Sequence, residues 1–102
     1  MTRYARKVDA NHARIVKALR AIGVAVIDTS QHGEFVDLVT VQRGVIRLIE
    51  VKDGAKPPSA REMTPAQVRL HALVEAHGGT VHVVISEDEA IALHQAVSSN
   101  IT

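Results

Sequence analysis

The sequence predicts a single small α/β domain, a mixed sheet flanked by helices in the order α-β-β-β-α-β-α. Helical and strand-like apolar spacings alternate along the chain, and no internal repeat or linker divides it. A chain of 102 residues is long enough for one domain with one core. One fold must therefore provide whatever activity the protein has.

The first half of the chain predicts one helix and three strands. Residues 9–22 carry apolar side chains at helical spacing, and Gly23 ends the helix. Three β-rich runs follow at 24–29, 35–42 and 45–52. Arg43-Gly44 separates the last two runs and favours a two-residue hairpin loop, although Asn-Gly or Asp-Gly is the stronger pair.

The second half predicts a loop, two helices and one strand. Residues 53–62 have a loop composition, and Thr64-Pro65-Ala66-Gln67 has the form of a capping box that opens a helix to about residue 77. A strand at 80–85 follows, and a second capping box at 86–89 opens a last helix.

The domain is expected to occupy residues 9–97. A basic arm precedes it at residues 1–8, and a frayed tail follows at 98–102.

Composition and charge exclude several classes of protein. No run reaches the roughly 18 apolar residues of a membrane span, and no signal peptide is evident, so we expect a cytoplasmic location and no membrane partner. The absence of cysteine excludes disulfides and thiol nucleophiles, and the six histidines lack the spacing of a helical zinc pair. We expect no organic cofactor. Residues 1–20 hold six Arg or Lys and one acid, which favours a polyanion partner or, alternatively, a solvated helix face.

Charged residues fall inside two of the predicted strands. A hairpin loop at Arg43-Gly44 pairs residue 42 with residue 45, and the same register continued places Asp37 opposite Glu50, with Lys52 diagonal to Asp37. Two opposed carboxylates repel unless a proton or a cation lies between them. Mg²⁺ commonly takes one or two carboxylates together with waters and phosphate oxygens. The pattern therefore resembles a Mg²⁺ site, and a structural ion pair of Lys52 with either acid is the alternative.

These residues resemble the PD-(D/E)XK nuclease superfamily, in which an acid on one strand is followed by (D/E)-x-K on the next. The matching segments are "FVDLV" and "IEVK", and the loop and helix "DGAKPPSAREMTPAQVRLHALVEAHGG" resemble small phage-type virus-type replication-repair nucleases (VRR-NUC), relatives of Holliday junction resolvases. The resemblance covers residues 9–95. It implies a restriction-endonuclease-like fold with an α-β-β-β-α-β core and a DNA endonuclease that depends on Mg²⁺ or Mn²⁺.

The resemblance also implies a role for each site residue. Asp37 and Glu50, with the carbonyl of Val51, would hold the metal, and Lys52 would orient the attacking water. Gln67 would lie near the active site, where its capping-box role explains it equally well. Candidate phosphate contacts, with solvated surface as the alternative for each, are Arg43, Lys56, Arg61 and Arg69, together with Arg3, Arg6 and Lys7 of the arm.

Two positions depart from the family pattern. Val36 stands where a Pro is usual before the first acid, and Arg14 stands where relatives often have a metal-binding Glu in the first helix. Either His12 or Glu34 substitutes for that Glu, or the metal has one fewer protein ligand.

Three functions are therefore expected in order of preference. The first is a homodimeric endonuclease that cuts four-way or otherwise branched duplex DNA. The second is a catalytically impaired DNA-binding module with the same fold. The third is a purely structural partner protein.

Overall fold

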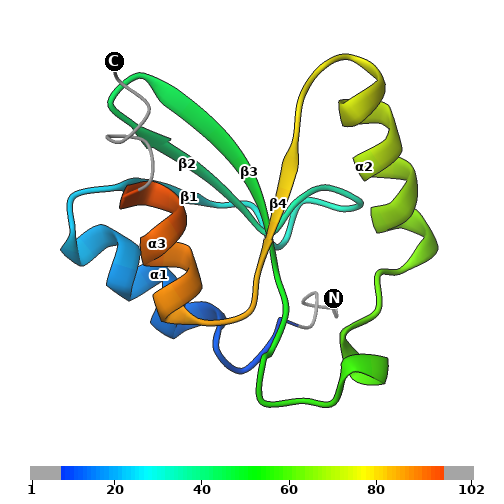
Figure 1. The fold of residues 1–102 in the computed structure, drawn as a ribbon, viewed down its shortest axis with the longest axis horizontal. Coiled ribbons are helices and arrows are strands. Elements are labelled where there is room, and N and C mark those ends of the chain that lie inside the picture. The colour runs from blue at the N-terminus through cyan, green and yellow to red at the C-terminus, as the bar shows by residue number, and fades with distance from the viewer. Residues whose placement is uncertain (1–7, 96–102) are drawn as a thin grey trace, which may run out of the picture.

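The structure is a computed structural model that describes residues 8–95 (Figure 1). Its elements follow the predicted order and are α1 His12–Ala21, β1 Ala25–Asp28, β2 Leu38–Gln42, β3 Val45–Val51, the 3₁₀ helix η1 Pro58–Arg61, α2 Pro65–Ala76, β4 Val81–Val84 and α3 Glu87–Gln95. The expected basic arm, with Arg3, Arg6 and Lys7, and the expected tail at 98–102 lie outside the described residues. None of the helices within 8–95 is long and apolar enough to cross a membrane.

The four strands form one mixed sheet in the order β1-β2-β3-β4. β1 and β3 pair with β2 in antiparallel fashion, whereas β3 and β4 run parallel, a pairing that needs a long crossover connection. That connection carries η1 and α2. The sheet is therefore mixed because the helix α2 returns the chain to the end at which β3 began.

The hairpin between β2 and β3 has the register that its two-residue loop predicts. Leu38 pairs with Ile49 and Gln42 pairs with Val45. Both loop residues have positive φ, 51° at Arg43 and 78° at Gly44, as a type I′ turn requires. Glycine adopts this conformation freely, whereas a residue with a Cβ is strained there by about 1–2 kcal/mol.

The hydrophobic core lies on one face of the sheet, under α1 and α3. Ile15 and Leu19 of α1 and Leu38 and Ile49 of the sheet are fully buried in one cluster, which Ala90 of α3 joins. Figure 1 shows α1 and α3 side by side, and α2 standing apart from them beyond β4. Helix α2 therefore contributes little to this core and is free to shape the opposite side of the sheet.

Two sequence-based boundaries differ from the structure in informative ways. The expected strand at 35–42 begins at Leu38, because the Asp37 amide donates to the carbonyl of Ile49 (3.1 Å) instead of continuing the ladder toward Glu50. The expected loop at 53–62 contains η1, in which Pro58 occupies the first helical turn. Proline has a fixed φ and needs no amide partner there, which favours such a turn.

A polar cluster interrupts the core beneath α3. His94, 1% exposed, joins α3 to β2, because its Nε2 lies 2.8 Å from the Thr40 hydroxyl and its Nδ1 lies 2.8 Å from the Ala90 carbonyl. Burial lowers the pKa of His94 and of His82, and the nearby Arg47 guanidinium lowers both further. Both imidazoles are thus held in the neutral form inside the fold.

Stability is expected to fall as the pH drops below about 6.5, the ordinary histidine pKa. The unfolded chain takes up protons at His94 and His82 first, because the folded pKa values are lower, so each proton favours unfolding. Burial alone would raise the pKa of the Asp28 carboxyl, but hydrogen bonds from Ser30 and His12 outweigh it and lower this pKa to about 2. The contribution of Asp28 to folding stability is therefore lost only below about pH 4. Urea unfolding curves at pH 7.5 and pH 5.5 separate the two effects.

His94→Gln should flatten this pH dependence and lower stability at pH 7.5 by about 1–3 kcal/mol, the cost of disturbing a buried hydrogen-bond pair. His32→Gln, at an exposed position, is the matched control. An unchanged pH profile in His94→Gln would contradict the role given to the buried imidazole.

Candidate active site

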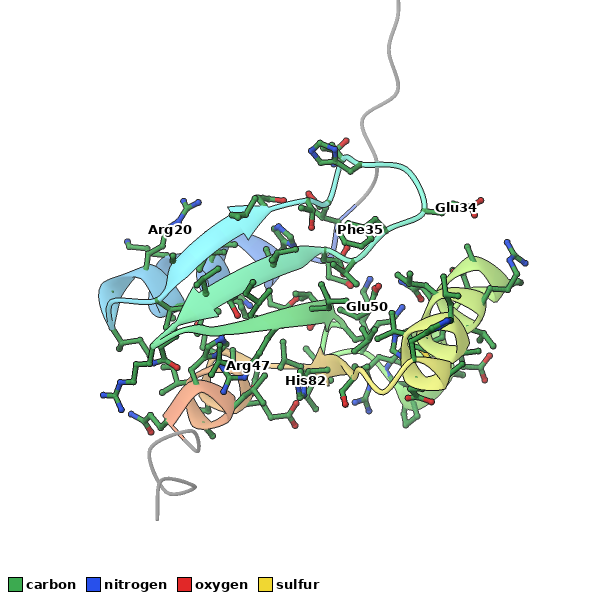
Figure 2. All side chains as sticks on the ribbon, turned by 90° about the horizontal axis from the view of Figure 1, so that it is seen from above. Arg20, Glu34, Phe35, Arg47, Glu50 and His82 are labelled. Carbon is green, nitrogen blue, oxygen red and sulfur yellow. The ribbon has the colours of Figure 1, made fainter. Side chains whose placement is uncertain are left out.

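A cleft of about 330 Å³ opens where β2 begins, β3 ends and α2 begins. It is lined by Val8, Asp9, Gly33, Glu34, Phe35, Asp37, Val51, Lys52, Thr64, Ala66, Gln67 and Leu70. Figure 2 shows Glu50 at the end of β3 nearest α2, with Glu34 and Phe35 on the loop that precedes β2. Two strand ends and a helix N-terminus thus converge on one hollow.

Asp37 is fixed in the cleft by the backbone of β3. Its Oδ2 accepts a hydrogen bond from the Val51 amide at 2.8 Å, and its own amide donates to the Ile49 carbonyl. The side chain is 9% exposed. The hydrogen-bond ladder between β2 and β3 is therefore broken at Asp37, and the Asp37 carboxylate contacts the backbone of Val51 on β3.

Gln67 joins the other two residues of the predicted motif. Its Nε2 donates to Oε2 of Glu50 at 2.8 Å, and its Oε1 accepts from the Lys52 ammonium at 2.8 Å. Glu50 is fully buried and does not line the cleft. The Gln67 amide consequently lies between the Glu50 carboxylate and the open part of the cleft.

The position of Gln67 follows from the way α2 begins. Thr64 is the N-cap. Its hydroxyl accepts a hydrogen bond from the backbone amide of Gln67 at 3.2 Å, and its own backbone amide donates to the side-chain Oε1 of Gln67 at 3.0 Å. The predicted capping box is therefore present, and the sequence left open whether capping or proximity to the site explains Gln67. The structure gives one side chain both contacts.

The Lys52 ammonium bonds to oxygens of α2 and of the loop that precedes it. It donates to Gln67 Oε1 at 2.8 Å and to the Glu62 carbonyl at 3.4 Å. The same Gln67 side chain donates to Glu50. Gln67 therefore links Lys52 to Glu50, and the ion pair of Lys52 with an acid stays an alternative.

Asn11 anchors the site from beneath, a function that the sequence did not indicate. Its Nδ2 donates to the carbonyls of Lys52 and Ile85, both at 3.1 Å, and its side chain is 2% exposed. It is the N-cap of α1 but makes no side-chain capping bond there. An Asn before a helix predicts a cap, so only the tertiary structure could reveal that it joins α1 to the ends of β3 and β4.

The residues considered for the missing helix-one acid lie in different places. Arg14 is exposed and pairs with Glu87 at 3.6 Å. His12 is buried and pairs with Asp28 at 3.0 Å, and it is not among the cleft-lining residues. Glu34 does line the cleft, where its carboxylate lies 3.6 Å from Arg69.

Asp9 is a cleft acid that the sequence analysis did not select. It precedes α1, lines the cleft and pairs with Lys56 at 3.5 Å. The signal available in the sequence was an acid at the first position of the predicted first helix, which is explained equally well as a helix-terminus charge. In the part of the chain that the structure describes, no three acids or histidines come close enough to form a ready metal cluster.

The four candidate phosphate contacts separate into two groups. Lys56 and Arg69 do not line the cleft but pair with Asp9 and Glu34, which do, and Arg61 ends η1 nearby in sequence. Arg43 lies in the hairpin before Val45, and Val45 is roughly 20 Å from Val51 at the strand rise of about 3.3 Å per residue. Two of the four thus contact acids of the cleft, and Arg43 lies away from it.

Comparison with known proteins adds an independent observation. No family model and no curated protein matches the sequence. Among solved structures, the chain is similar to one described as "VRR_NUC domain", with a TM-score of 0.61 and 29% sequence identity, over 85% of this chain and 97% of that chain. This similarity confirms the predicted restriction-endonuclease-like fold and supports the resemblance to VRR-NUC and PD-(D/E)XK nucleases, hence a nuclease domain.

Thr64→Ala is expected to lower the free energy of unfolding by about 1 kcal/mol, since it removes an N-cap. The contacts of the Gln67 side chain should persist, because the Thr64 backbone amide, Lys52 and Glu50 still bond to it. Ser59→Ala in η1 is the control at an exposed hydroxyl. Equal stability of the two variants in urea unfolding would contradict the capping role.

Proposed function

We propose that this protein is a divalent-metal-dependent DNA endonuclease that hydrolyses phosphodiester bonds in branched duplex DNA, four-way junctions above all, as a homodimer. One observation carries the proposal: Asp37 and Lys52 line one cleft, Gln67 links Lys52 to the buried Glu50, and the three charged residues follow the chain order of the nuclease motif. The similarity to a VRR_NUC domain supports the same reading.

The donor set suits Mg²⁺ or Mn²⁺. Asp37 and Glu50 supply hard carboxylate oxygens, and both are buried, which favours their binding to a cation. The backbone amide of Val51 donates to the Asp37 carboxylate, whereas the backbone amide of Lys52 donates to the Val84 carbonyl of β4. Since the amide and carbonyl of one strand residue point to the same side, the Val51 carbonyl is available as a third oxygen. When bound, the metal would acidify a water and screen the phosphate charge.

The protein residues divide the remaining work. Lys52 would orient the attacking water and stabilise the charge that develops on the phosphate oxygens, a role suited to a compact ammonium. Gln67 would position Lys52 and Glu50 together, because a single amide bonds to both. Asp37 is held ready by the Val51 amide.

Duplex backbone is the substrate that the surface chemistry favours. Lys56 and Arg69, which pair with acids of the cleft, and Arg61 in η1 would contact phosphates. With one Tyr and one Phe, the chain has no platform of aromatic side chains for stacking single-stranded bases.

A homodimer would match the symmetry of a four-way junction. One domain of this size carries one active site and little further recognition surface, and C2 dimers are the commonest closed oligomers. Two sites related by a two-fold axis could cut two opposed strands without reading sequence. This is the reason for preferring a junction to a plain duplex.

The second candidate is a catalytically impaired DNA-binding module. Two observations favour it: Arg14 replaces the usual helix-one acid and faces Glu87, and no cluster of three metal-binding side chains lies within residues 8–95. Asp9 and Glu34 line the cleft and are the acids available to compensate. Metal binding distinguishes this candidate from the enzyme.

Asp37→Asn, Glu50→Gln and Lys52→Ala are each expected to abolish cleavage of a four-way junction in Mg²⁺ or Mn²⁺ while the domain stays folded. Removing charge from a cluster of buried acids should cost little stability, and either acid variant should melt at or above the wild-type temperature in chelator. Glu75→Gln, an exposed carboxylate in α2, is the control. Products from junction, flap, duplex and single-stranded DNA are sized on a denaturing gel.

Calorimetry with Mn²⁺ completes this experiment. The enzyme predicts heat of binding in wild type that is lost in Asp37→Asn. Equal titrations of the two proteins, without cleavage, would favour the binding module, and cleavage that survives all three substitutions would refute the site. Equal cutting of plain duplex would leave a nonspecific nuclease.

Lys56→Ala and Arg61→Ala are expected to weaken DNA binding similarly for all sequences, each lowering the salt slope by about one. Lys17→Ala, on the exposed side of α1, is the matched control, because it removes the same charge away from the cleft. Fluorescence anisotropy at several salt concentrations measures the slopes. A changed base preference would contradict a phosphate-contact role.

A further inference from the structure

Among residues 8–95, the face of the sheet opposite α1 and α3 is aliphatic and is largely left uncovered over β1, β2 and β3. Ile27, Ile46 and Val83 on this face are 55%, 68% and 42% exposed, and Val39, Val41 and Leu48 between them are half-buried. Figure 2 looks onto the sheet with α1 behind it and α2 beyond its end. We call these six residues the open face.

The strand register makes the open face continuous. Ile27, Val39 and Leu48 pair in one row across three strands, and Val41 and Ile46 pair in a second row across two. On β4, Val81 continues the first row but is buried, and the exposed Val83 pairs with Glu50. An antiparallel sheet with one face in water normally carries polar residues there. On the described strands, the one ionisable side chain of this face is Glu50, which is fully buried at the cleft end.

The size of the open face is that of an interaction surface. Three strands at about 4.8 Å spacing and five residues at about 3.3 Å rise give roughly 240 Å² of planar area, to which Val83 of β4 adds. Exposed apolar patches of about 300–600 Å² are the largest on a typical monomer and often functional. Two such faces bury less than the 1,600 Å² or so of a standard interface, which places their contact in the weak, dissociable class.

We propose that the open face is the surface through which two copies of this chain associate. The inference rests on the homodimer of the proposed function and names the surface that forms it. A nearly flat, aliphatic face without exposed charge is complementary to itself, because an isologous pairing brings no like charges together. DNA would find no cation there, and a charged protein partner would find no opposite charge.

The placement of the open face connects assembly to the cleft. Glu50 ends the same face, so a second copy packed on it lies beside the cleft. Association would also withdraw Ile46 and Ile27 from water, the two most exposed aliphatic side chains of the sheet. The two active sites of a dimer are thereby held in a fixed relation.

Sedimentation equilibrium without DNA or metal tests the proposal independently of cleavage. Wild type should show a reversible monomer–dimer equilibrium between about 1 and about 100 µM, as expected for a small aliphatic interface. Ile46→Glu and Ile27→Glu, on different strands, should each weaken the dimer by about tenfold or more, because each buries two unpaired carboxylates. Both positions are exposed in one copy, so circular dichroism should show unchanged folds.

Ile22→Glu is the matched control, since Ile22 is 42% exposed but follows α1 on the covered side of the sheet. It should dimerise like wild type. A wild-type protein that remains a monomer up to about 100 µM, or dimers that persist in both open-face variants, would overturn the proposal. If wild type dimerises and the variants do not, yet no protein cleaves DNA, the surface stands and the proposed catalytic function fails.

Discussion

The side-chain amide of Gln67 is the contact on which the rest of the site depends. It bonds to Glu50 and Lys52 at the end of β3 and also closes the capping box that starts α2 with Thr64. The helix α2 makes few other contacts with the sheet, so this amide is its principal polar connection to the strands. The same side chain therefore caps α2 and fixes the position of α2 relative to Glu50 and Lys52.

A second constraint is the unequal covering of the sheet. Helices α1 and α3 bury one face around Leu19 and Ile49, and α2 stands beyond β4 instead of lying on the other face. This arrangement leaves room for the cleft at one end of the uncovered side and leaves aliphatic side chains exposed over the rest. The two surfaces that we assign, to DNA and to a second copy, both follow from where α2 is placed.

Polar residues beneath the sheet join the helices to the strand ends. Asn11 donates to the carbonyls that follow β3 and β4, and His94 bridges α3 and the Thr40 hydroxyl of β2. Buried polar groups cost free energy unless they are hydrogen-bonded, and these bonds fix each element in one position. Arg14 stands where the family resemblance led us to expect an acid, and the acids Asp9 and Glu34 line the cleft.

The sequence by itself determined the order of the elements, the register of the hairpin and the identity of the motif residues. These follow from local rules: apolar periodicity, the two residues of the Arg43-Gly44 loop and the Thr64 capping box. Only the tertiary structure decided how Asp37 leaves the ladder to meet Val51, that Lys52 bonds to Gln67, and that Asn11 and Asp9 lie near the site. Such contacts join segments far apart in the chain, and their formation depends on how α1 and α2 pack, which no local pattern encodes.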